Sequence, residues 1–150
     1  MGTFWGSTKV LENAGLNVVK TVKYQNLFPM LDGSRFDYFP RAVHEPWKEL
    51  ADRKELALSV EEKLLLIYPY AMYFYVRKDN VELHDRLQKG LELAIQDGSF
   101  DDVFFSNSLV QSALALAKLG SRRVLRINNP DMHPETPIDR PEFWLNISNL

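Results

Sequence analysis

The feature that most constrains this chain is the stretch of residues 63–100, KLLLIYPYAMYFYVRKDNVELHDRLQKGLELAIQDGSF. Its first part, residues 64–76, is an apolar run rich in Leu, Tyr, Phe and Val. That composition is typical of a strand buried on both faces. Pro69 limits how much of the run can lie in the middle of a sheet, because proline has no N–H to donate.

The second part of the stretch predicts an amphipathic helix. After a polar break at residues 77–80, Asp79 or Asn80 is suited to cap the helix start, and Gly98 lies where a left-handed stop is needed. The order is therefore strand, tight connection, helix and glycine stop. The apolar face of the helix is formed by residues at helical spacing: Leu83, Leu87, Leu91, Ala94 and Ile95.

The residues before this stretch alternate short helices with short strands. Ser7 or Thr8 is suited to cap the first helix, which Gly15 ends. Such alternation with short connections predicts an α/β fold on a parallel sheet. The further elements expected here are a strand at Asn17–Val22, a helix at Tyr24–Leu31, a strand at Phe36–Phe39, a helix at Val43–Ala51 and an edge strand within residues 52–62.

The residues after the stretch predict a short turn, a helix, a strand and an irregular tail. The turn is Asp101–Phe105, and the helix is Ser108–Leu119, closed by Gly120. Arg122–Ile127 is the expected strand. From Asn128 onward, repeated prolines exclude regular structure.

Two of these segments resemble type 2 periplasmic solute-binding proteins, the family-3-like receptors that deliver amino acids and similar small polar solutes to ABC importers. Residues 73–100, YFYVRKDNVELHDRLQKGLELAIQDGSF, resemble the returning strand and helix of that family. Residues 6–40, GSTKVLENAGLNVVKTVKYQNLFPMLDGSRFDYFP, resemble part of its second lobe. The family's G-R-(F/V/L)-D pattern is interrupted here by Ser34, between Gly33 and Arg35.

The resemblance implies a partial three-layer αβα fold of the periplasmic-binding-protein type 2 kind. Residues 1–62 would be the remainder of a second-lobe-like subdomain. Residues 63–150 would be the returning first-lobe-like strand, the helices and the Pro-rich tail. A parallel sheet that lacks strands leaves open edges and apolar faces. We therefore expect completion by oligomerisation or exchange of elements, in a homodimer or higher homo-oligomer, with a compact monomer as the alternative.

The function implied by the resemblance is non-enzymatic binding of a small polar or anionic solute, such as an amino acid. The alternative is an oligomeric structural or interaction protein that keeps the fold but has lost ligand binding. The resemblance implies a periplasmic location. The sequence shows no export signal, so a cytoplasmic location is expected if Met1 is the true start.

Five residues are predicted to bind the ligand: Trp5, Ser7, Thr8, Arg41 and Glu45. Family members hold the ligand's acid group at the loop that matches Gly6–Thr8, although Ser7 or Thr8 could simply cap the helix. Arg41 follows a strand end, where open α/β sheets bind ligands, and it would suit an anionic group. The alternative for Arg41 is a surface pair with Glu45 at helical spacing.

Composition excludes several other functions. The net charge of −2 leaves no basic excess for nucleic-acid binding. The chain has no cysteine, and its three histidines share no ligand spacing, so neither a metal nor another cofactor is expected. No Ser-His-Asp set or phosphate-binding loop is present, and no stretch predicts a membrane span.

Overall fold

The computed structural model describes residues 1–147, so the last three residues of the predicted tail, 148–150, lie outside it. The described chain combines helices with a small sheet, which agrees with the broad α/β class. Its elements are α1 (Gly6–Asn13), α2 (Leu27–Asp32), α3 (Pro46–Ala51), β1 (Leu64–Ile67), α4 (Val81–Gln96), α5 (Ser99–Ser106), α6 (Ser108–Ala117) and β2 (Arg123–Arg126), with 3₁₀ turns at Tyr24–Asn26, Leu119–Ser121 and Pro141–Phe143.

The sheet has two parallel strands, with Leu64 opposite Arg123 and Ile67 opposite Arg126. The parallel pairing and the predicted strand near Arg123 are confirmed. The prediction of a strand over residues 64–76 is wrong beyond Ile67, where the pairing stops. Pro69 explains this early end, because its missing N–H prevents a regular ladder from continuing.

Three other predicted strands do not form. Asn17–Val22 contributes only one isolated parallel bridge, between Thr21 and Gly2, and neither Phe36–Phe39 nor residues 52–62 pair with another strand. A strand needs a lateral partner over several residues, and residues 1–3 give Asn17–Val22 only a short one, through bonds from the Thr3 N–H to the Thr21 carbonyl and from the Thr21 N–H to the Met1 carbonyl. Phe39 packs its ring against Phe28 instead, at 5.5 Å between ring centroids.

The helix predictions are largely confirmed, with corrections at the ends. The Leu83 N–H donates to Asn80 Oδ1 at 3.2 Å at the start of α4, and Gly98 follows that helix with a φ of 79°. Neither Ser7 nor Thr8 caps α1, because Trp5 is the N-cap residue and its side chain makes no capping bond. The turn predicted at Asp101–Phe105 is part of α5, and α6 ends at a left-handed Lys118 (φ 48°) rather than at Gly120.

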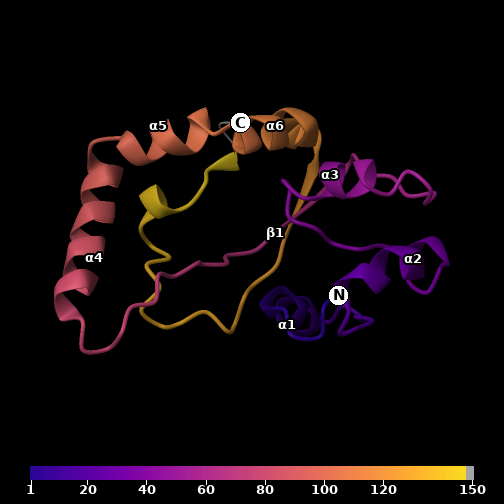
Figure 1. Ribbon diagram of the computed structural model, residues 1–150, viewed down its shortest axis with the longest axis horizontal. Coiled ribbons are helices and arrows are strands. Elements are labelled where there is room, and N and C mark those ends of the chain that lie inside the picture. Colours follow the sequence, from indigo (N-terminus) through magenta and orange to yellow (C-terminus); the bar gives the residue numbers. More distant parts are fainter. Residues whose placement is uncertain (148–150) are drawn as a thin grey trace.

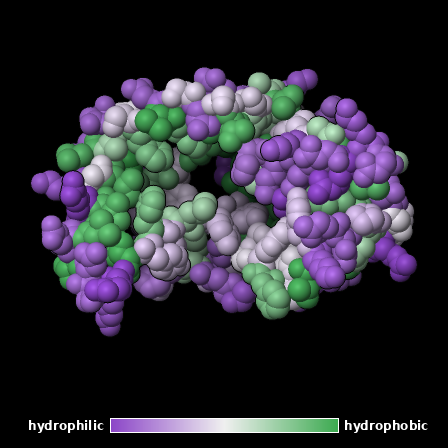
Figure 2. Space-filling model, in the orientation of Figure 1, coloured by the Kyte–Doolittle hydropathy of each residue, from purple (hydrophilic) through white to green (hydrophobic). Residues whose placement is uncertain are grey.

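The helices α4, α5 and α6 follow one another as an arch, and the tail after β2 runs inside it (Figure 1). The helices α1, α2 and α3 lie at the other end of the molecule. Figure 2 shows a hollow between the arch and this N-terminal part. No helix within residues 1–147 combines the length and the apolar character needed to cross a membrane.

The buried core is small. Its larger part is formed by Val10 and Leu11 of α1 and by Leu27 and Phe28 of α2, whereas α4 and α5 bury no residue fully. The accessible surface is 11510 Å² for a mass of 17.4 kDa. A compact monomer of this mass exposes about 7,800 Å². The chain therefore leaves much apolar surface uncovered.

Candidate functional site

The guanidinium of Arg41 lies among three aromatic rings. Its Cζ atom is 5.2 Å from the ring centroid of Trp5, 5.3 Å from that of Tyr24 and 5.0 Å from that of Phe39. Trp5 and Phe39 stack on each other with centroids 6.2 Å apart. These distances are in the range of cation–π attraction. The N-terminus, the turn before α2 and the loop before α3 therefore meet at Arg41.

Two carboxylates neutralise the Arg41 guanidinium. Its Nε donates to Glu49 Oε2 at 2.9 Å, and its Nη2 donates to Glu45 Oε1 at 2.7 Å. The second Glu45 oxygen accepts from the Ala42 N–H at 2.7 Å. The Arg41 and Glu49 side chains are only 13% and 14% exposed, so these bonds are largely shielded from water. The Arg41–Glu45 pair, the alternative given for Arg41, forms, but it is largely buried rather than on the surface, and Glu49 joins it.

The six side chains Trp5, Tyr24, Phe39, Arg41, Glu45 and Glu49 are called the Arg41 cluster below. Burial of the Glu49 carboxylate opposes its ionisation, but hydrogen bonds from Arg41 and Tyr24 outweigh burial and lower the Glu49 pKa. Burial likewise opposes the charge on Arg41, and its bonds to the two glutamates outweigh this and raise the Arg41 pKa. The cluster is therefore an ion network that stays charged around neutral pH.

Thr8 is buried and stabilises the fold rather than lining an open site. Its hydroxyl donates to the Gly2 carbonyl at 2.7 Å, and the residue is 2% exposed. A buried hydroxyl needs such a partner. Thr8 thereby fastens α1 to the N-terminal residues.

Ser7 faces the aromatic run that follows β1. Its side chain is close enough to Tyr68 to lower the pKa of that phenol, although burial is the larger effect and raises the Tyr68 pKa. The Tyr70 hydroxyl comes so close to Gly6 that a Cβ there would lie 2.1 Å from the hydroxyl oxygen. The start of α1 is therefore lined by Ser7, Tyr68 and Tyr70, and position 6 has no room for a side chain.

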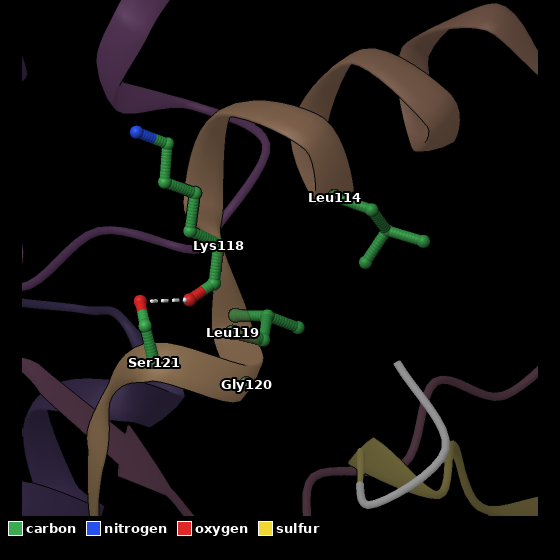
Figure 3. A pocket seen from close by; sticks show the side chains of 5 residues that line it. All are labelled: Leu114, Lys118, Leu119, Gly120 and Ser121. Atoms are coloured by element: carbon green, nitrogen blue, oxygen red, sulfur yellow. Dashed lines mark hydrogen bonds between the residues drawn. The ribbon is translucent and has the colours of Figure 1, made fainter.

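Two cavities lie outside this region. One, of about 330 Å³, is mainly apolar and lies at the end of α6, where Leu114 and Leu119 face it and the Lys118 chain extends away (Figure 3). The other, of about 60 Å³, lies beside Met1, Leu11 and Phe36. None of the five predicted ligand-binding residues lines either cavity.

The structure thus brings together three of the five predicted residues, Trp5, Arg41 and Glu45, and places Ser7 and Thr8 on the adjoining helix. Sequence reasoning missed Tyr24, Phe39 and Glu49. The i, i+4 spacing of Glu45 and Glu49 was a usable signal, since it puts both carboxylates on one side of α3. Nothing local in the sequence connects Tyr24 with Arg41.

Comparison with protein-family models, curated proteins and solved structures finds no significant match to this chain.

Proposed function

We propose that this chain is a non-enzymatic, small-solute-binding-type domain of the kind that serves ABC importers. Its ligand would lie at the start of α1, against the Arg41 cluster. The sequence resemblance motivates this proposal, and one observation carries it. Trp5 and Arg41 are both predicted from the sequence as ligand contacts. The Arg41 Cζ lies 5.2 Å from the Trp5 ring centroid, although 36 positions separate the two residues.

The cluster suggests how a zwitterionic solute such as an amino acid would be held. A ligand carboxylate would replace Glu45 on Arg41 Nη2, and the released Glu45 would meet the ligand ammonium. This exchange keeps every charge paired, which avoids the penalty of a partly buried unpaired ion. The N–H groups at the start of α1 and the Ser7 hydroxyl would bind the same acid group, and the Trp5 ring would cover the solute's apolar part.

A thermal-shift screen with amino acids, polyamines and small carboxylates tests the proposal. A ligand that binds only the folded chain stabilises it by about 2.7 kcal/mol at a hundred times its dissociation constant. We expect an amino acid or carboxylate to raise the melting temperature. Trp5→Ala should abolish the rise, and Arg86→Ala, a change of an exposed arginine on α4, should leave it intact. A flat response across the whole screen would refute solute binding.

The second candidate is an oligomeric structural or interaction protein that has lost ligand binding. Two observations favour it: Arg41 is already bound by two carboxylates, and neither described cavity lies at the predicted site. A solution mass above that of one chain, together with no ligand-induced shift, would select this candidate. In both candidates, the large uncovered surface calls for another polypeptide surface.

A further inference from the structure

The seven residues that follow Pro69, YAMYFYV at positions 70–76, form the most exposed apolar segment of the described chain. Met72 and Tyr75 are each 92% exposed, and Phe74 is 72% exposed. The segment contains no charge and no proline, and β-branched or aromatic residues dominate it. Such a composition has a high preference for strands and a strong tendency to pair with other chains.

The backbone of this segment is also unpaired. Within residues 1–147, none of its N–H or C=O groups bonds to another backbone group. Its side chains are anchored through the hydroxyl contact between Tyr73 and Thr136 and through the Tyr70 ring, which packs edge-on against Tyr68 with ring centroids 6.2 Å apart. A strand-prone segment in this state presents the same open row of donors and acceptors as the edge of a sheet.

The apolar surface continues from this segment onto α4. Val81 is 59% exposed and Leu93 is 50% exposed, and Figure 2 shows apolar residues gathered over the arch that α4 and α5 form. Residues 70–96 carry no net charge, because four basic residues balance four acidic ones. The basic residues are Arg77, Lys78, Arg86 and Lys89, and the acidic residues are Asp79, Glu82, Asp85 and Glu92.

We propose that residues 70–76 pair as an antiparallel β-strand with the same residues of a second copy of this chain. The inference goes beyond solute binding, because it names the partner and the contact that would cover the exposed surface. A two-fold axis perpendicular to a pair of identical strands makes them antiparallel. With that axis at Tyr73, Met72 lies opposite Phe74, and Tyr70 lies opposite Val76, an aromatic–β-branched pair of the kind that stabilises sheets.

Area and charge both favour a second copy as the occupant. The chain exposes roughly half as much surface again as a compact monomer, and obligate homodimers bury about 2,000–5,000 Å² in total. The uncovered surface is therefore sufficient for such an interface. A two-fold contact sets a patch against itself, and the balanced charges of residues 70–96 do not oppose this.

Single-cysteine variants test the geometry directly, because the chain has no cysteine of its own. We expect Tyr73→Cys to form an inter-chain disulfide under mild oxidation, since antiparallel partners bring Cβ atoms within about 5 Å. Cysteines scanned over positions 71–75 should give one maximum, at the two-fold axis. Leu109→Cys on α6, which is 73% exposed, is the control and should not cross-link efficiently.

Analytical ultracentrifugation provides the second readout. Wild type should sediment as a dimer, and Met72→Asp with Tyr75→Asp should raise the dimer dissociation constant by about tenfold or more, because the carboxylates would be buried. Leu109→Asp should leave it unchanged. A monomeric wild type, or a dimer indifferent to both the aspartates and the cysteines, overturns the inference. If a ligand raises the melting temperature of a chain that stays monomeric, the dimer inference is also overturned, whereas the proposal of solute binding is supported.

Discussion

The guanidinium of Arg140 and the carboxylate of Glu92 form two parallel hydrogen bonds, Nη1 to Oε1 at 2.7 Å and Nη2 to Oε2 at 2.8 Å. This fork ties the tail to α4 across 48 residues of sequence. Arg140 also lies 4.0 Å from the ring centroid of Phe143, so one side chain holds both the helix and the following turn.

Replacing Arg140 should loosen the tail without unfolding the body. We expect Arg140→Ala to accelerate amide hydrogen exchange over residues 128–147, because the pair with Glu92 is the long-range ionic link between this part of the tail and α4. The melting temperature should change little, since the pair is partly exposed. Arg140→Lys should rescue only in part, because lysine lacks the fork. Unchanged exchange in Arg140→Ala would show that other contacts hold the tail.

Shortening Leu27 should severely destabilise the chain. Leu27, the first residue of α2, is fully buried, and Leu→Ala at such a site costs about 2–5 kcal/mol. That is a large part of the stability of a typical domain. The matched control is Leu109→Ala, which removes the same atoms from a 73% exposed position and should cost less than about 0.5 kcal/mol. Urea unfolding followed by tryptophan fluorescence measures both, and equal midpoints would contradict this account of the core.

Acid should destabilise the fold through Glu49. The pKa of Glu49 in the folded chain is lowered, because the bonds from Arg41 and Tyr24 outweigh burial. In the unfolded chain a glutamate has a pKa of about 4.3. The Glu49 contribution is therefore fully present above that unfolded value and is lost as pH falls through the lower folded value. Hydrogen bonds to a charged group contribute about 1.5–3 kcal/mol.

Urea midpoints measured at pH 6, 4 and 3 should show this loss in wild type. In Glu49→Gln the slope over the same window should be smaller, since the substituted side chain does not titrate. Glu55→Gln alters an exposed carboxylate and serves as the control. If Glu49→Gln and wild type lose stability in parallel on acidification, the network at Arg41 is not the acid-sensitive element.

A methyl group at position 6 should disturb the contact between α1 and Tyr70. The Cβ of Gly6→Ala would lie 2.1 Å from the Tyr70 hydroxyl oxygen, so the ring must move; because this is the tip of a half-exposed side chain, we expect the cost to be at the low end of overpacking, about 1 kcal/mol. In a Tyr70→Ala background the same change should be nearly neutral. Gly90→Ala is the matched control, because a Cβ in the middle of α4 meets nothing within 4 Å, and it should stabilise by about 0.5–1 kcal/mol. Equal effects of Gly6→Ala in both backgrounds would disprove the clash.

Helices were predictable from the sequence because their signals are local. Asn80 caps α4 as expected, and the apolar spacing of α4 and α6 sufficed to find them. Strand predictions failed where the described residues give no partner segment long enough for a ladder: Asn17–Val22 has a single bridge to Gly2, and Phe36–Phe39 has no strand partner. Strand formation depends on distant pairing, which short-range pattern does not contain.

In the candidate site, too, contacts between residues close in sequence were predictable, and contacts between distant residues were not. The Arg41–Glu45 pair could be found from its spacing, and it forms at 2.7 Å. The approach of Tyr24 and Phe39 to Arg41 depends on how distant loops fold together, so no local pattern in the sequence predicts it. Thr8 looked like a cap or a ligand contact and instead bonds to the Gly2 carbonyl, a partner that only the folded N-terminus provides.

The left-handed lysine that ends α6 has a practical consequence. Lys118 adopts a φ of 48°, a conformation that glycine accepts freely and that costs other residues about 1 kcal/mol or more. Ser34, with a φ of 55°, is in the same left-handed region, so the strain at Lys118 is one of two such places within residues 1–147. We therefore expect Lys118→Gly to relieve this strain and raise the stability of the folded chain, which would help crystallisation or spectroscopy.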